Sequence, residues 1–115
     1  MDTCYSVYLD DIRSPHYITE SKRYNLVVCR SYSEFKSTVE AVGELPYFIS
    51  FDHDLGEGAE TGYDVARWVV EQVLNGTYKL PGGFSYSVHS ANPPGADNIQ
   101  GLLDSFVKFY REIKK

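Results

Sequence analysis

The stretch FISFDHDLG, residues 48–56, passes from an apolar segment directly into an acidic one. Its first four residues form a short run that is typical of a buried strand. Asp52, His53 and Asp54 follow without a spacer. A strand that ends in such a triplet brings polar side chains to one point of the fold, so we predict a functional site there.

The same arrangement occurs twice more in the chain. The segment YSVYLDDIRSP ends a strand-like run in Asp10 and Asp11, and the segment FSYSVHSANPPG ends one in His89, Ser90 and Asn92. Three predicted strands therefore carry polar residues at their C-terminal ends.

Predicted strands and helices alternate along the sequence. The strands cover about residues 5–9, 25–29, 47–51 and 84–88. The segments SYSE, residues 31–34, and TGYD, residues 61–64, resemble capping boxes and predict two helix starts. Gly76 is available as a C-cap for the second helix. A third helix is indicated by an apolar stripe from Ile99 to Ile113.

This alternation favours an α/β fold with a parallel sheet, because parallel neighbours need a crossover connection. Right-handed crossovers to both sides of the first strand predict about four strands in the flavodoxin-like order 2-1-3-4, within a three-layer architecture. Ligands in such sheets bind outside the carboxyl ends of the strands. The polar strand ends are therefore expected to converge on one crevice, and the last helix is expected to close one sheet edge.

Composition limits the class of protein. The chain has 115 residues, 13.1 kDa and 43% apolar residues, which suits a single domain over residues 1–115. The formal charge of −5 argues against an extended nucleic-acid partner but allows a small phosphorylated ligand. Without a membrane-length apolar run or a leader, we expect a cytoplasmic protein with no membrane partner. Cys4 and Cys29 are interpreted as buried thiols, although their pairing stays open.

Four carboxylates at two neighbouring strand ends, those of Asp10, Asp11, Asp52 and Asp54, would repel one another unless a cation or protons intervene. Mg²⁺, or Mn²⁺ in its place, is the natural partner for such oxygen ligands. The alternative is that some of these residues only cap turns. Because adjacent residues of a strand point to opposite faces, Asp10 and Asp11 are not equivalent.

His53 and His89 both follow predicted buried strands. Imidazole titrates near neutral pH, so the two could act as general base and general acid at a phosphoester. The alternative is a partly buried histidine that only hydrogen-bonds a carboxylate. His16 is predicted to be a bystander in a loop.

Several further residues are candidates for binding phosphate. Arg13 offers a forked set of donors, or forms a salt bridge to Asp11. Ser90 and Asn92 offer hydroxyl and amide groups. Asn98 is expected near the N-terminus of the last helix, where anions bind well, unless Asp97 simply caps that helix.

These motifs resemble the receiver domains of two-component response regulators. By that match Asp54 takes the phosphoacceptor position, and Asp10 and Asp11 take the magnesium-binding position. The fifth strand of a receiver, with its lysine, has no counterpart here. Asp52, His53 and His89 are additions that a receiver does not need.

The combination of YLDDIRSP, FDHDLG, TGYDVARW and SVHSAN is more similar to the cyclic-phosphate-processing receiver-like domains of bacteria and phages. This resemblance implies a receiver-like fold and action on nucleotide or ADP-ribose cyclic phosphates, in conflict or RNA-repair pathways.

Three hypotheses of function follow. The first is a metal-assisted phosphoesterase or cyclic phosphodiesterase, in which Asp10, Asp11 and Asp54 hold Mg²⁺ while His89 and His53 transfer protons. The second is a signalling receiver that is phosphorylated on Asp54. The third is a protein that binds or sequesters nucleotides without turnover.

Overall fold

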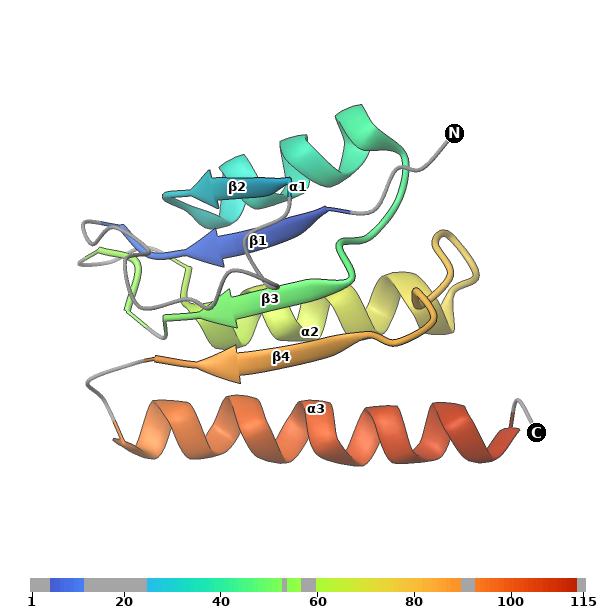
Figure 1. Ribbon diagram of the computed structural model, residues 1–115. Helices are drawn as coiled ribbons and strands as arrows, with labels where there is room; N and C mark the ends of the chain where they lie inside the picture. The colour runs from blue at the N-terminus through green and yellow to red at the C-terminus, as the bar shows by residue number, and fades with distance from the viewer. Residues whose placement is uncertain (1–4, 12–24, 53, 57–59, 90–92, 114–115) are drawn as a thin grey trace.

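A computed structural model describes residues 5–11, 25–52, 54–56, 60–89 and 93–113. Four short strands form one parallel sheet, as Figure 1 shows: β1 (Ser6–Leu9), β2 (Leu26–Cys29), β3 (Phe48–Phe51) and β4 (Ser85–Val88). Their order is β2-β1-β3-β4. The predicted parallel sheet and the order 2-1-3-4 are confirmed, and each strand begins one residue later than predicted.

Strand alternation gives the sheet two different faces. The side chains of Val7, Leu9, Ile49 and Phe51 belong to the buried apolar core. The residues between them point the other way and are mostly polar. In β4, for example, Ser85 and Ser87 lie on this second face and Tyr86 lies on the core face. The core face therefore holds the fold together, while the second face carries buried polar side chains such as Ser6 and Ser50.

Three helices supply the other half of the core: α1 (Tyr32–Val42), α2 (Gly62–Leu74) and α3 (Pro93–Ile113). The start of α2 is a capping box, in which the Thr61 N–H donates to Asp64 Oδ2 over 2.7 Å and the Asp64 N–H donates to Thr61 Oγ1 over 3.3 Å. The start of α1 is capped by Ser31, whose Oγ accepts from the Glu34 N–H. Both predicted starts are confirmed.

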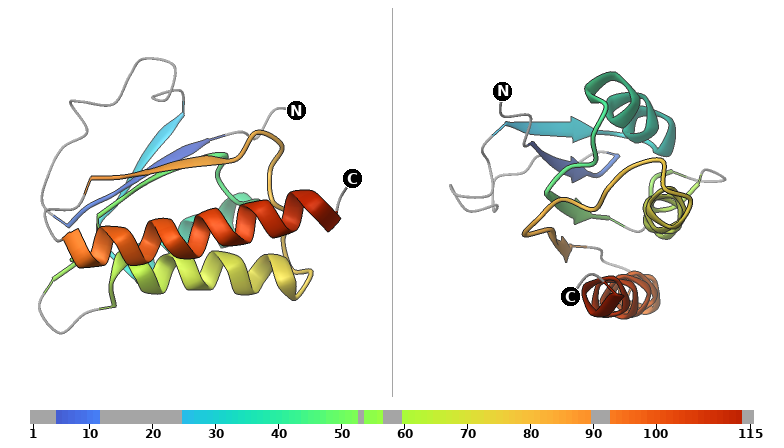
Figure 2. Two further views of the ribbon diagram at one scale, coloured as in Figure 1. Left: turned by 90° about the horizontal axis from the view of Figure 1, so that it is seen from below. Right: turned by 90° about the vertical axis from the view of Figure 1, so that its right-hand side faces the viewer.

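Figure 2 shows the three described helices on the same side of the sheet. Helix α2 packs between α1 and α3, and α3 runs beside the edge strand β4. The crossover from β1 to β2 falls within residues 12–24, outside the described residues, and so does any helix of the predicted third layer.

Two helix ends differ from the prediction. Helix α3 begins at Pro93, so Asp97 is not its N-cap and Asn98 lies beyond the first turn. Proline suits a first turn because its fixed φ is helical and its missing N–H is not needed there. Helix α2 is capped by Asn75, and Gly76 follows with a φ of 81°. No helix in the described ranges is long and apolar enough to cross a membrane.

Cys29 is a buried free thiol, as predicted, and its Sγ lies 3.6 Å from Thr38 Oγ1. Burial raises the pKa of this thiol, while the contact with Thr38 acts in the opposite direction. Cys29 is therefore an unreactive part of the core, and Cys4 lies outside the described residues.

The docking of α3 can be tested with two matched leucines. Leu103 is 0% exposed in the core and Leu74 is 59% exposed at the end of α2. Truncation of a buried leucine leaves a cavity, so Leu103→Ala should lower the free energy of unfolding by about 2–5 kcal/mol. The control Leu74→Ala should change it by less than about 0.5 kcal/mol. Urea denaturation of both variants measures the difference, and equal effects would show that α3 is not docked through this face.

Candidate functional site at the carboxyl edge of the sheet

Asp10, Asp52 and His89 form one row across three neighbouring strands. The parallel ladder continues one residue past each strand, because the Asp52 N–H donates to Leu9 O over 2.9 Å and the His89 N–H donates to Phe51 O over 2.8 Å. Each residue of the row therefore lies opposite the next. The row lies at the carboxyl ends of the strands, where ligand sites are expected in parallel sheets.

A second row lies two residues earlier on the same face. It consists of Tyr8, Ser50 and Ser87, which are register partners in β1, β3 and β4. Residues two apart in a strand share a face, so this row lies directly behind the first. Tyr8 and Ser50 are buried, whereas Ser87 is exposed.

Hydrogen bonds connect the two rows through His89. Its Nε2 lies 3.0 Å from Asp10 Oδ2, and its Nδ1 lies 2.7 Å from Ser50 Oγ. The side chains of His89 and Asp10 are only 7% and 0% exposed, so the pair is shielded from water. The ring of Tyr8 stacks on the imidazole at 4.6 Å and 3°. Both ring nitrogens of His89 are thus engaged and the plane of the ring is fixed.

The donor set of the first row fits a divalent cation. One ligand atom from each of Asp10, Asp52 and His89 lies within 4.8 Å of the others. Its two carboxylates are the kind of oxygen ligands that hard divalent ions take. The group could therefore hold a metal ion, and it contains Asp10 and Asp52, two of the four aspartates that were predicted as ligands.

Arg30 extends the row on the other side of Asp10. The Asp10 N–H donates to Cys29 O over 3.1 Å, which places Arg30 opposite Asp10 at the end of β2. Arg30 Nη1 donates to the main-chain oxygen of Asp10 over 3.1 Å, and the Arg30 N–H donates to Glu34 Oε1 over 2.7 Å. The guanidinium of Arg30 is therefore held at the main chain of Asp10.

The other predicted site residues lie elsewhere. Asp11 is half-buried and Asp54 is exposed, and neither joins the group of possible metal ligands found among the described residues. For Asp11 the reason is strand alternation, which separates it from Asp10. Asp54 lies three residues past the end of β3. Asn98 is exposed on α3. Arg13, His53, Ser90 and Asn92 lie outside the described residues.

Sequence reasoning missed four residues of this site: Tyr8, Arg30, Ser50 and Ser87. For three of them a signal was available, because each stands two positions before Asp10, Asp52 or His89 and so shares its face. Arg30 directly follows the predicted second strand. It was the only polar residue directly after a predicted strand that was not considered as a candidate. The missing information was the register that joins these positions.

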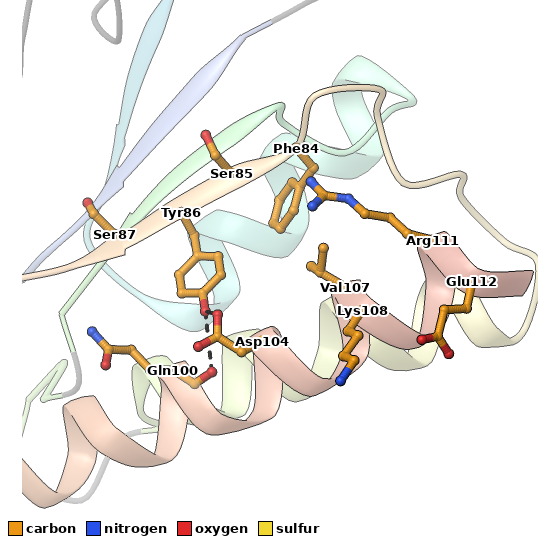
Figure 3. A pocket seen from close by; sticks show the side chains of 10 residues that line it. All are labelled: Phe84, Ser85, Tyr86, Ser87, Gln100, Asp104, Val107, Lys108, Arg111 and Glu112. Atoms are coloured by element: carbon orange, nitrogen blue, oxygen red, sulfur yellow. Dashed lines mark hydrogen bonds between the residues drawn. The ribbon is translucent and has the colours of Figure 1, made fainter. Parts of the chain in front are cut away.

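A groove of about 810 Å³ lies along β4 and α3, and the β4 residues that line it come from both faces of the sheet. Figure 3 shows Phe84 and Tyr86 pointing toward α3, while Ser85 and Ser87 point away from it. The Tyr86 hydroxyl donates to Gln100 O over 3.3 Å and to the carboxylate of Asp104. Burial is the main cause that raises the pKa of Tyr86, and the contacts with Asp104 raise it further. The hydroxyl therefore keeps its proton and acts as a hydrogen-bond donor. Asp10, Asp52 and His89 do not line this groove, whereas Ser87 of the second row does.

Two aspartates of the same triplet offer a matched test of ion binding. If the row is the metal site, Asp52→Asn should abolish saturable Mg²⁺ and Mn²⁺ binding, because a neutral amide replaces one of two anionic ligands. Asp54→Asn removes the same charge from an exposed position outside the row, so it should leave ion binding intact. Titration calorimetry on the two variants decides the point. If Asp54→Asn loses ion binding while Asp52→Asn keeps it, the ion is held by Asp54, as the sequence predicted, and not by the row.

Comparison with known proteins gives one match. The family model of the cyclic-phosphate processing receiver domain matches residues 5–105. Neither the search of curated proteins nor that of solved structures found a match. The matched range includes all four strands and most of α3, together with the row at the strand ends. The chain therefore belongs to the family of cyclic-phosphate processing receiver domains.

Proposed function

We propose that the protein is a phosphoesterase that opens a small nucleotide-derived or ADP-ribose cyclic phosphate by hydrolysis. The observation that carries the proposal is the row of Asp10, Asp52 and His89 at the carboxyl edge, in a chain of this family. A buried pair of carboxylates beside an imidazole offers both a place for a cation and a group that exchanges protons.

The phosphate of the substrate is anionic and would be repelled by the two carboxylates. We assign Mg²⁺, or Mn²⁺, to the oxygens of Asp10 and Asp52, where the ion would offset this repulsion and polarise the phosphoryl oxygens. Arg30 supplies a second positive charge at the same edge. A guanidinium suits phosphate because its donors are arranged as a fork. Binding the anion therefore depends on groups at three strand ends.

Hydrolysis adds water across one P–O bond of the cyclic diester. The water oxygen bonds to phosphorus and loses a proton, while the leaving oxygen gains one and becomes a hydroxyl. We assign the proton of the leaving oxygen to His89, whose Nε2 lies 3.0 Å from Asp10 Oδ2. The proton of the attacking water goes to a second base, for which His53 stays the predicted residue. The product is a phosphomonoester.

A substitution of His89 tests this assignment. His89→Gln keeps an amide that can donate to Asp10 but cannot transfer a proton, so turnover should fall by about 10²- to 10⁴-fold. Affinity for substrate should change little, because the proton moves in the transition state. ³¹P NMR on a panel of cyclic phosphates, with Mg²⁺ and with EDTA, measures turnover. His16→Gln, at a predicted bystander, is the matched control.

The same panel separates this proposal from signalling or simple binding. Wild-type protein that hydrolyses none of the cyclic phosphates but is labelled on Asp54 by acetyl phosphate would be a receiver that signals through its phosphoacceptor. Wild-type protein that binds a cyclic phosphate without either reaction would be a sequestering protein. Each of these two results contradicts the enzymatic proposal.

A further inference from the structure

The outer edge of β4 is open in the described part of the chain, where the sheet ends at this strand. The Ser85 N–H donates to Tyr47 O over 2.9 Å, so every second residue of β4 bonds to β3 through its main chain. The N–H and C=O groups of Tyr86 and Val88 point to the opposite edge. They have no strand to pair with among the described residues and are available for hydrogen bonds.

The sequence of β4 does nothing to block this edge. Natural proteins protect an exposed edge strand with charged side chains, proline or a bulge. Strand β4 has the sequence SYSV, without a charge or a proline, and all four residues keep a regular register with β3. The edge is therefore able to accept a further strand.

The groove along β4 and α3 gives an added strand a place to lie. Because its lining includes residues from both faces of β4, the groove follows the edge of the strand and not one face alone. On the side of α3, Val107 offers an apolar contact, and the carboxylate of Asp104 is already engaged by the Tyr86 hydroxyl. A strand in the groove would cover Val107 and pair with the open main-chain groups.

Arg111 gives the groove a preference for negative charge. Figure 3 shows its side chain reaching from α3 toward Phe84, whereas Lys108 and Glu112 point away from β4. Within the ranges that the structure describes, Arg111 forms no ion pair. A carboxylate at the end of the groove near Phe84 would therefore meet a guanidinium whose donors are not committed to another acid.

A second copy of the chain fits this edge less well than a single strand. Antiparallel pairing of β4 with the β4 of a copy makes one continuous sheet, with the helices of both copies on the same side. Helix α3 already lies beside β4 on that side, as Figure 2 shows, so the two α3 helices would meet. An extended peptide makes the same main-chain hydrogen bonds and brings no helix.

We propose that the outer edge of β4 binds an extended peptide segment of another protein by strand addition, with an apolar side chain against Val107 and an acidic one paired with Arg111. Main-chain hydrogen bonds to Tyr86 and Val88 hold the segment, and the two side-chain contacts set its sequence preference. This binding does not depend on the proposed hydrolysis, because the row at the carboxyl edge takes no part in it.

Amide hydrogen exchange tests whether the edge is open. In the free protein the amides of Tyr86 and Val88 should exchange at least about tenfold faster than that of Ser87, which is bonded to β3. Slow exchange of both amides at every protein concentration would show that the chain itself covers the edge. Exchange that slows only as the protein is concentrated would assign the edge to a second copy. Either result overturns the proposal.

The probe for binding is an acetylated peptide of alternating valine and threonine with a glutamate at each end, so that a carboxylate reaches Arg111 in either strand direction. In a ¹H–¹⁵N titration it should bind saturably and should slow the exchange of the Tyr86 and Val88 amides. The same peptide with every peptide nitrogen methylated cannot pair and should not bind. Failure of the parent peptide to bind, or equal binding of the methylated one, overturns the proposal.

Two matched charge reversals test the acidic partner. Arg111→Glu replaces attraction by repulsion, so it should weaken binding of the glutamate peptide about fivefold and strengthen binding of a peptide that ends in lysines. Arg67 is 56% exposed on α2, where it pairs with Glu71 outside the groove, so Arg67→Glu should bind both peptides as wild type does. Equal affinity of wild type and Arg111→Glu for the glutamate peptide contradicts an acidic partner and overturns the proposal.

Discussion

The register of the parallel sheet is the constraint on which the site depends. Each strand is only four residues long, and the ladder extends one residue beyond it to Asp10, Asp52 and His89. Parallel strands paired in this register place corresponding residues side by side, so the residues at three strand ends form one row. A shift of one residue in any strand would turn its polar side chain toward the apolar core.

The alternation of side chains along each strand separates the residues of the apolar core from those of the candidate site. One face of the sheet, with Val7, Leu9, Ile49 and Phe51, packs against all three described helices. The other face carries hydroxyls, an imidazole and carboxylates in two rows. Asp10 and Ser50 on this face are buried, at 0% and 1% exposure, so their hydrogen bonds are shielded from water.

The buried pair of Asp10 and His89 is the electrostatic centre of the proposed site. A charge buried at 0% exposure needs partners, and Asp10 has the imidazole at Oδ2 and Arg30 at its main-chain oxygen. These contacts hold the ring of His89 at the carboxylate of Asp10 and the guanidinium of Arg30 at its main chain. The proposed phosphate site therefore needs no broad positive surface of the kind that nucleic-acid binding requires.

The sequence by itself determined the alternation of strands and helices, the helix starts at Ser31 and Thr61, and the polar strand ends, because caps and periodicity are local signals. It also named Asp10, Asp52 and His89 among its candidates. Only the tertiary structure decided that these three form the row, that Asp54 stands outside it, that Arg30 extends it, and that Ser50 supports it from the second row. Within a strand Ser50 looks like any other residue. Its role arises from pairing with strands that lie some forty residues away in sequence, and such pairing leaves no local trace.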